Sequence, residues 1–230
     1  MEVPNTTPSC VGFILDGNRR WAKERGLSTV EGHKRGYEVL QESFSWVKEA
    51  KIPHVVCYAF SSENWNRSPE EVAYLMKLFE SGLQQMQEER IKSADRINIR
   101  FIGERSRLSP KLIAHMETIE ASTHKDPELT VWIALSYGGR REIIEAVNRA
   151  VQEGGEVTEE RFNDLLWTKD MPDPDLIIRT SGEQRLSNFL PWQSVYSELF
   201  FADTYWPDFN KAEFQSIVEA YGTRKRRKGI

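Results

Sequence analysis

The sequence predicts an α/β fold, a single domain with a mainly parallel sheet of about six strands flanked by helices. Short apolar runs alternate with longer segments of helical periodicity along all 230 residues, and no shift in composition marks a second domain. Clusters of polar residues directly follow several apolar runs, as they do where strands of a parallel sheet end. We therefore expect one domain over residues 1–230, with a flexible segment at 1–10 and a basic tail at 222–230.

The first elements follow from local signals. The apolar run 11–15 has the length of a buried strand, and a helical pattern resumes after the polar residues that come next. A helix is predicted over 33–50, because apolar residues recur on one face and Pro53 stops the pattern. The β-branched and aromatic run 55–60 predicts the second strand.

A helix start is also predicted after the second strand. Ser68, Pro69 and Glu71 have the spacing of an N-cap, a first-turn proline and the acid of a capping box. The helix that follows carries an apolar stripe, and most such stripes are simply part of a core. A function for this stripe depends on what lies at its end.

The second half continues the alternation. Gly103 ends one strand pattern, and prolines and hydroxyl residues start helices. The glycine pair at 138–139 is interpreted as a tight strand-to-helix turn or as a second anion site. Further strands are predicted at 97–102, 129–136, 175–178 and 198–202, and further helices at 109–123, 142–152, 158–167 and 211–221.

Composition excludes several classes of protein. The chain has 31 Lys+Arg and 35 Asp+Glu, a net charge of −4, so we expect no nucleic-acid partner and only local anion recognition. Cys10 and Cys57 lie in or beside apolar strands without zinc-ligand spacing, which predicts free thiols in a reducing compartment. Neither a signal peptide nor an apolar run of about 18 residues is present, so a soluble cytoplasmic protein is expected.

The first polar cluster follows the first strand. Asp16 is placed at the strand tip, where a carboxylate can hold a hard divalent cation. Gly17 allows close backbone approach, and the N–H groups of Asn18, Arg19 and Arg20 open a helix in an arrangement that favours a phosphate or diphosphate. The alternative is an Asx-type turn followed by a solvated basic helix start.

Two more clusters follow other strands. The loop 61–67 contains a Trp that either closes over a ligand or folds back on the core. The loop 179–188 places two arginines, two serines and a glycine together, as a diphosphate site needs, although a solvated basic loop has the same composition. Because parallel strands end on one side of a sheet, the three clusters are expected to converge. Two anion sites beside apolar helices suggest the joining of two phosphorylated hydrocarbons.

At this point the chain resembles the cis-prenyltransferases, the family of undecaprenyl diphosphate synthases. Segments 16–23, 32–34, 59–67, 137–140 and 175–198 match the five characteristic regions of that family in order and spacing. The resemblance implies an undecaprenyl diphosphate synthase-like fold and a homodimer. It also implies two substrates, isopentenyl diphosphate and an allylic diphosphate.

The resemblance implies a role for individual residues. Asp16 and Asn64 are the implied catalytic residues, and Asp16 and Glu198 the implied Mg²⁺ ligands, with Glu198 supplied across the dimer. The basic tail at 227–229 resembles a motif that reaches the partner subunit's site. The implied substrate-binding residues are Gly17, Asn18, Arg19, Arg20, Trp21, His33, Ser61, Ser62, Glu63, Trp65, Arg67, Arg179, Arg185, Leu186 and Ser187.

Three positions depart from the family pattern. Arg19 stands where many members have glycine, and Thr29 stands where several have a further arginine, so Arg19 compensates for a missing phosphate contact. Gln184 replaces a histidine found near the metal in some members. Asp16 and Glu198 are then the remaining metal candidates.

The function expected from the resemblance is condensation of isopentenyl diphosphate onto an allylic primer such as farnesyl diphosphate. The expected product is undecaprenyl diphosphate, a lipid carrier for cell-wall synthesis, with peripheral membrane contact through that product. A short-chain cis-prenyl diphosphate synthase is one alternative. A noncatalytic subunit of a prenyltransferase complex is another, although such subunits tend to lose the acid and arginines that are present here. A phosphate-ester hydrolase would need a placed nucleophile or a water-activating base, and no strand end offers a second acid beside Asp16.

Overall fold

The computed structural model describes residues 7–92 and 96–224. Its elements in chain order are β1 (Cys10–Ile14), α1 (Asn18–Glu24), α2 (Thr29–Glu49), β2 (His54–Ser61), η1 (Ser62–Asn66), α3 (Pro69–Lys92), β3 (Ile97–Ile102), α4 (Pro110–Ala121), β4 (Leu129–Tyr137), α5 (Gly139–Glu153), α6 (Glu159–Leu165), β5 (Leu176–Arg179), β6 (Glu198–Phe201), η2 (Trp206–Asp208) and α7 (Lys211–Thr223). Residues 1–6 of the predicted flexible segment and the predicted tail motif at 227–229 lie outside the described residues.

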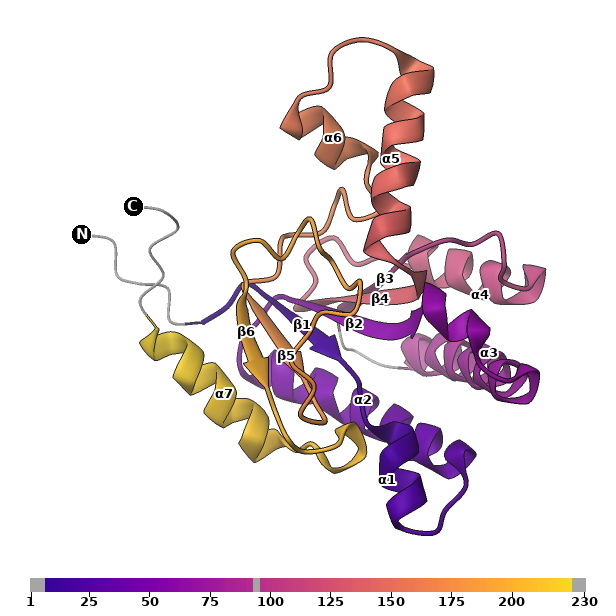
Figure 1. Cartoon of the computed structure of the whole chain (residues 1–230), viewed down its shortest axis with the longest axis vertical. Coiled ribbons are helices and arrows are strands. Elements are labelled where there is room, and N and C mark those ends of the chain that lie inside the picture. The colour runs from indigo at the N-terminus through magenta and orange to yellow at the C-terminus, as the bar shows by residue number, and fades with distance from the viewer. Residues whose placement is uncertain (1–6, 93–95, 225–230) are drawn as a thin grey trace.

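The strands form one six-stranded parallel sheet in the order β3-β4-β2-β1-β5-β6 (Figure 1). This confirms the predicted fold class. The central strand β1 pairs with β2 on one side and with β5 on the other, so Ile14 lies between Tyr58 and Arg179. After β1 the chain builds the sheet first on the β2 side and then on the β5 side. Where the direction of building changes in this way, an α/β sheet opens a crevice at the carboxyl ends of its strands. The three polar clusters follow β1, β2 and β5 and meet there.

The two faces of the sheet are covered differently. Phe13 belongs to the larger core, which β-strand side chains form with helices α2, α3, α4 and α7. Ile14, the next residue, points to the other face and packs with Met171 and Phe189 from the segment around β5. Because successive strand residues point to opposite faces, a strand buried on both sides is continuously apolar, as 11–14 is.

Helices α5 and α6 extend away from the sheet and pack mainly on each other (Figure 1). Ala146 and Ala150 of α5 contact Phe162 and Leu165 of α6 in a small separate core. Among the described residues, none of the helices has the length and apolar composition of a membrane span.

Some predicted boundaries were wrong. Helix α2 begins at Thr29 rather than at 33, because Ser28 and Glu31 form a capping box in which each side chain accepts a hydrogen bond from the other residue's backbone N–H. Cys10, which was assigned to the flexible segment, is buried in β1. The preceding Ser9 is held by Asp175, whose carboxylate accepts from the Ser9 backbone N–H at 2.7 Å.

Candidate active site

Asp16 lies just beyond β1 in a turn that is held by neighbouring groups. The Thr180 hydroxyl accepts a hydrogen bond from the Asp16 backbone N–H at 3.1 Å and donates to the Asp16 carbonyl oxygen at 2.7 Å. Gly17 has φ +107°, and a Cβ at this position would lie 2.7 Å from a ring carbon of Tyr205. Only glycine fits there without strain. The turn directs the Asp16 side chain into the space beyond the sheet edge.

Two arginines flank the Asp16 carboxylate. Arg179 Nη2 donates to Oδ2 at 2.8 Å, and Arg20 Nη2 lies 3.3 Å from Oδ1. Burial raises the pKa of Asp16, but the hydrogen bond and charge of Arg179 and the charge of Arg20 together outweigh it and hold that pKa below its ordinary value. Asp16 is therefore an anion at neutral pH.

Arg179 connects the end of β1 to the loop that follows β5. Its side chain is only 5% exposed, although it is charged. Besides Asp16, its guanidinium donates to the Ser187 hydroxyl at 2.7 Å and to the carbonyl oxygen of Arg185. A buried arginine needs such partners, because an unpaired charge in the interior is strongly unfavourable. Arg179 thus holds both Asp16 and Ser187 in place.

A cavity of about 790 Å³ lies on the α1 side of Asp16 and is rich in cationic side chains. Its basic lining groups come from the start of α1, from α2 and from the loop after β2. The lining residues are Leu15, Asp16, Gly17, Asn18, Arg19, Arg20, Lys23, Gly26, Leu27, Ser28, Thr29, His33 and Arg67. Arginine forks and a lysine around one space fit the oxygens of a diphosphate.

Two glycines of α2 place α1 beside this cavity. A Cβ at Gly32 would lie 2.2 Å from the Asn18 carbonyl oxygen, and one at Gly36 would lie 2.0 Å from Asn18 Oδ1. Real Cβ contacts are never that short, so only glycine lets the start of α1 pack this closely on α2. The Asn18 side chain also donates to the Leu15 carbonyl oxygen at 3.0 Å, which braces the Asp16 turn.

Glu71 at the start of α3 gathers three groups that line the same cavity. Its Oε1 accepts from Arg67 at 2.9 Å, lies 3.2 Å from His33 Nε2 and lies 3.9 Å from Arg19 Nε. Burial is the main cause of a lowered pKa at His33, with Arg67 and Arg19 adding to it and Glu71 opposing it. His33 is therefore neutral at pH 7.

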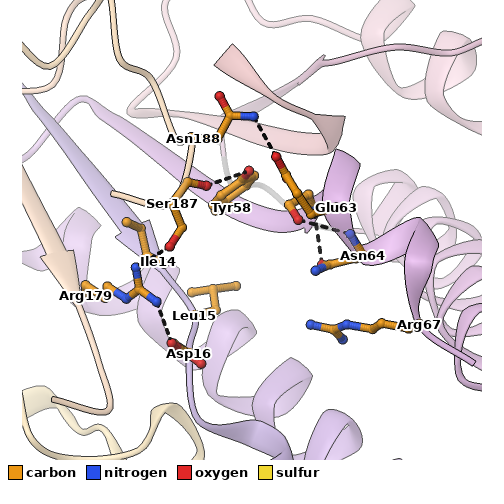
Figure 2. Close-up of a pocket in the computed structure, with 11 residues that line it drawn as sticks. Ile14, Leu15, Asp16, Tyr58, Glu63, Asn64, Arg67, Arg179, Ser187 and Asn188 are labelled. Carbon is orange, nitrogen blue, oxygen red and sulfur yellow. Dashed lines mark hydrogen bonds and ion pairs between the residues drawn. The ribbon is translucent and has the colours of Figure 1, made fainter. Parts of the chain in front are cut away.

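A second cavity of about 500 Å³ lies between β1, β2 and the loop after β5 (Figure 2). It shares Leu15, Asp16 and Arg67 with the first. Its lining residues are Ile14, Leu15, Asp16, Tyr58, Ser61, Glu63, Asn64, Arg67, Arg179, Ser187 and Asn188. Two polar cavities therefore meet at one carboxylate.

Asn64 is held in a fixed orientation at the edge of the second cavity. Its Oδ1 accepts a hydrogen bond from the Ser61 backbone N–H at 3.1 Å, and the Asn64 backbone N–H donates to the Ser61 hydroxyl at 3.2 Å. These two bonds form a capping box at the start of η1. The amide oxygen of Asn64 is thus engaged by the backbone.

A channel leads from the two cavities between β2, α2 and α3, and its lining becomes apolar with depth. A space of about 110 Å³ is lined by residues that include Tyr37, Leu40, Ala59 and Phe79. The same four residues line a deeper space of about 30 Å³, which reaches Gly82 and the buried side chains of β3 and β4. The apolar stripes of α2 and α3 therefore border the channel as well as the core.

Neither predicted tryptophan lines the two polar cavities. The Trp21 indole N–H donates to Asp208 at 2.7 Å, and Arg25 lies 4.6 Å above the indole ring. The Trp65 N–H donates to the Ser136 hydroxyl at 2.9 Å, and its ring packs edge-on against Phe60. Trp65 thus folds back on the core, the second of the two alternatives given by the sequence.

Other predicted residues lie beside the cavities. Arg185 is 60% exposed and pairs with Glu183, which also accepts from Arg20. The Ser62 hydroxyl donates to Glu63, and Leu186 packs partly buried against the second core. The structure brings together in the cavity walls the predicted residues Asp16, Gly17, Asn18, Arg19, Arg20, His33, Ser61, Glu63, Asn64, Arg67, Arg179 and Ser187.

Glu198 does not lie near Asp16 in this chain. It begins β6 and pairs with Leu176, whereas Arg179 at the other end of β5 pairs with Ile14 at the end of β1. At about 3.3 Å per residue, Glu198 is on the order of 10 Å below the carboxyl edge of the sheet. Its carboxylate pairs with Arg224 at 2.5 Å. Of the two predicted metal ligands, Asp16 is therefore the one that lines the cavities within one chain.

The donor set suits a magnesium ion that shares its coordination with a substrate. In residues 7–92 and 96–224, no group of three or more His, Cys, Asp or Glu side chains could form a protein cage for a metal. Mg²⁺ commonly takes one or two carboxylates and completes its shell with water and substrate phosphates. The ionised Asp16 carboxylate, between two cavities lined with arginines, fits that kind of site.

Thr180 and Asn188 are two residues of the site that are not among the predicted ones. Thr180 sets the Asp16 turn, and Asn188 lines the second cavity. Both lie in the 179–188 cluster, whose polar composition was noted, but nothing in the local sequence distinguishes them from neighbouring loop residues.

Comparisons with known proteins agree across the whole chain. The family model described as "Putative undecaprenyl diphosphate synthase" matches residues 14–229. An isoprenyl transferase of Thermotoga maritima is 45% identical over 227 residues, covering 96% of this chain and 97% of the relative. A tritrans,polycis-undecaprenyl-diphosphate synthase (geranylgeranyl-diphosphate specific) of Thermoplasma acidophilum is 42% identical over 229 residues, covering 96% and 89% of the two chains.

Solved structures of similar proteins have the same fold. A lavandulyl diphosphate synthase from Lavandula x intermedia, crystallised with dimethylallyl diphosphate, matches with a TM-score of 0.92 and 34% identity over 98% of this chain and 99% of its own. A probable undecaprenyl diphosphate synthase from Campylobacter jejuni matches with a TM-score of 0.81 and 32% identity over 97% and 99%.

Proposed function

The chain belongs to the undecaprenyl diphosphate synthase family of cis-prenyltransferases, and we propose that it elongates farnesyl diphosphate with isopentenyl diphosphate to undecaprenyl diphosphate in a Mg²⁺-dependent reaction. The observation that carries this proposal is the meeting of two polar cavities at Asp16, with an apolar channel leading away from them. Two diphosphates and one hydrocarbon chain fit such a branched space. The product would serve as a lipid carrier in cell-wall synthesis and bring the protein to a membrane.

In this proposal the two substrates lie on different sides of Asp16, and the two cavities support this placement. The allylic diphosphate occupies the larger cavity among Arg19, Arg20 and Arg67, with its hydrocarbon in the channel. Isopentenyl diphosphate occupies the second cavity at Ser187. Holding both substrates in this way makes their reaction effectively unimolecular, which lowers the barrier substantially.

The reaction needs charge stabilisation and removal of a proton. As the allylic C–O bond breaks, negative charge builds on the departing diphosphate, and the arginines of the larger cavity offset it. Asp16 would hold a Mg²⁺ ion, which would add Lewis-acid stabilisation of the same charge. The isopentenyl double bond attacks the allylic carbon, and loss of a proton leaves the new cis double bond.

Asn64 orients the proton acceptor in this proposal and does not accept the proton itself. A neutral amide is a very weak base, and Asn64 Oδ1 is already engaged by the Ser61 N–H. A water or a diphosphate oxygen beside Asn64 takes the proton.

The proposal is tested by incubating the purified protein with farnesyl diphosphate, labelled isopentenyl diphosphate and Mg²⁺. Labelled lipid is extracted, treated with phosphatase and sized. We expect a ladder ending at the length of undecaprenol that disappears when EDTA is added. Product formation unchanged by EDTA contradicts the role of Mg²⁺. Absence of labelled lipid with farnesyl, geranyl and dimethylallyl primers contradicts the proposed substrates.

The narrow apolar channel supports a short-chain synthase as the second candidate. Tyr37 lines both of its spaces, and a Cβ on Gly82 would lie 2.8 Å from the Tyr37 hydroxyl, so the ring reaches across from α2 to α3. Gln41 donates to that hydroxyl at 3.2 Å and helps to hold it there. A long product requires α2 and α3 to separate at this point.

Replacing Tyr37 with alanine is expected to lengthen the product, because it joins the two spaces of the channel into one. Chromatography of the dephosphorylated lipids measures the shift in chain length. Tyr37→Phe is the matched control, since it keeps the ring and removes only the hydroxyl, and its products should match those of the wild type. Unchanged product length in Tyr37→Ala would place Tyr37 outside the growing chain's path.

We propose that the protein is a homodimer and that an exposed apolar face of α5 lies in its interface. Ile144, Val147 and Val151 have the spacing of one helical face and are 53%, 43% and 75% exposed. Val195 and Tyr196, in the loop before β6, are also exposed, at 70% and 67%. Apolar side chains gathered on one helix face are typical of protein interfaces.

The double substitution Ile144→Glu with Val151→Glu is expected to convert the dimer to monomer, because it would bury four carboxylates in the interface. Light scattering reports the mass, which for the wild type should be twice 26.7 kDa. Val157→Glu, at a residue 50% exposed outside α5, is the control and should remain dimeric. A monomeric wild type, or a variant that stays dimeric, would refute this interface.

A further inference from the structure

Asn188 links three segments that are far apart in the sequence. Its Nδ2 donates to Glu63 Oε1 at 2.8 Å, and its Oδ1 accepts from the Arg140 backbone N–H at 2.8 Å. Its carbonyl oxygen accepts from the Gly139 N–H at 2.9 Å. Figure 2 shows the bond to Glu63 crossing one side of the second cavity. One residue thus joins the loop after β5 to the start of α5 and to η1.

The backbone around Asn188 is held in an uncommon conformation. Ser187 has φ +49° and Asn188 has φ +67°, values that few residues other than glycine adopt. Asparagine tolerates this region better than most residues, but a left-handed conformation persists only where surrounding contacts impose it. The three hydrogen bonds of Asn188 are such contacts.

The segments joined by Asn188 are packed without spare room. A Cβ at Gly138 would lie 2.3 Å from the Ser62 hydroxyl and 2.9 Å from Asn188 Nδ2. Below the loop, the Tyr58 hydroxyl lies 3.3 Å from the Ser187 carbonyl oxygen. The loop is therefore fixed from two directions, and Asn188 is its connection to η1.

We propose that Asn188 is a positioning residue that sets the distance between the two halves of the second cavity. On one side its neighbour Ser187 is bonded to Arg179, at the proposed isopentenyl diphosphate site. On the other side its partner Glu63 precedes Asn64, the residue proposed to orient the proton acceptor. This inference rests on the proposed function, because the two halves that Asn188 connects are the proposed isopentenyl diphosphate site and the proposed proton-acceptor site.

The test replaces the amide of Asn188 with a carboxylate. Asn188→Asp keeps the acceptor for Arg140 and the tolerance for positive φ, but it places a second negative charge against Glu63. We expect kcat to fall by about 10- to 100-fold, the order of loss that a misplacement of about 1 Å causes between reacting groups. The dissociation constant of farnesyl diphosphate measured alone should change by less than about threefold, because Asn188 and Glu63 do not line the larger cavity.

Rescue distinguishes positioning from general damage. Adding Glu63→Gln restores a donor opposite the new carboxylate. The kcat of the double variant should therefore be at least about tenfold higher than that of Asn188→Asp alone. Asn188→Gly, which adopts positive φ freely and removes both side-chain bonds, should lower kcat in the same way with the fold retained by circular dichroism. Asn210→Asp makes the same chemical change at the N-cap of α7 and should leave kcat unaltered.

The outcomes separate the inference from the proposed function. If the wild type forms prenyl products and Asn188→Asp turns over equally fast, or its loss is not recovered by Glu63→Gln, Asn188 has no positioning role. If the wild type forms no prenyl product, the proposed function itself fails.

Discussion

Replacing Asp16 with asparagine is expected to slow condensation by about 100- to 1,000-fold, the loss typical of removing one preorganised charge from an active site. The two side chains have the same shape, so the turn between β1 and α1 should persist. The negative charge between Arg179 and Arg20 is lost, however, and with it the carboxylate proposed to hold Mg²⁺. The substrate diphosphates would then bind beside two arginines with no carboxylate to hold the metal.

Initial rates with labelled isopentenyl diphosphate, measured over a range of Mg²⁺ concentrations, test this expectation. The wild type should be activated by Mg²⁺, and the variant should respond weakly at every concentration. Asp126→Asn removes a charge from an exposed loop and serves as the control, with full activity expected. An Asp16→Asn enzyme with normal rates and normal Mg²⁺ activation would remove Asp16 from the mechanism.

The convergence of the polar clusters could be predicted because it depends on topology. Asp16 follows β1 and Arg179 ends β5, and any parallel sheet places such residues at one edge. The register Ile14 to Arg179 then brings their side chains together. Apolar runs and caps were enough to predict the sheet, since they are local in the sequence.

The direction of long side chains could not be predicted in the same way. Trp65 turns toward Ser136, a residue 71 positions later whose hydroxyl accepts a hydrogen bond from the indole N–H, and Arg107 covers the ring at 4.4 Å. Trp21 turns toward Asp208, whose carboxylate accepts a hydrogen bond from its indole N–H. Both partners come from distant segments, and composition does not reveal such pairs. The roles of the substrate-binding residues remain predictions.

The role of Asn188 could not be predicted from the local sequence either. An asparagine in a polar loop is ordinary in sequence, and its importance lies in contacts with Glu63 and Arg140, which belong to other elements. Residues that contact a ligand carry chemistry that a motif can display. Residues that position those groups do so through the tertiary structure.

Replacing Arg179 with glutamine is expected to destabilise the protein by about 3 kcal/mol at pH 7, because removing one partner of a largely buried ion pair leaves the other charge uncompensated. Asp16 is partly exposed, which places the effect at the low end of the range for such pairs. The bonds that hold Ser187 and Arg185 are lost as well, so condensation should also fall sharply. Urea unfolding measures the stability, and Arg185→Gln, at an exposed ion pair, should cost less than about 1 kcal/mol.

The pH dependence of this destabilisation identifies its cause. Arg179 contributes to holding the pKa of Asp16 below its ordinary value of about 3.9. In the wild type the ionised pair therefore stabilises the fold fully above that value, and the contribution is lost as the pH falls through the lowered pKa of the folded state. Burial raises the pKa of Asp16, and in Arg179→Gln the charge and hydrogen bond of Arg179 no longer oppose this effect. The pKa of Asp16 is therefore higher in the variant than in the wild type. The gap in unfolding free energy between the two proteins should narrow between pH 7 and about pH 3, as Asp16 is protonated. A gap that stays constant over this range would show that packing around Arg179, and not its pairing with Asp16, supplies the stability.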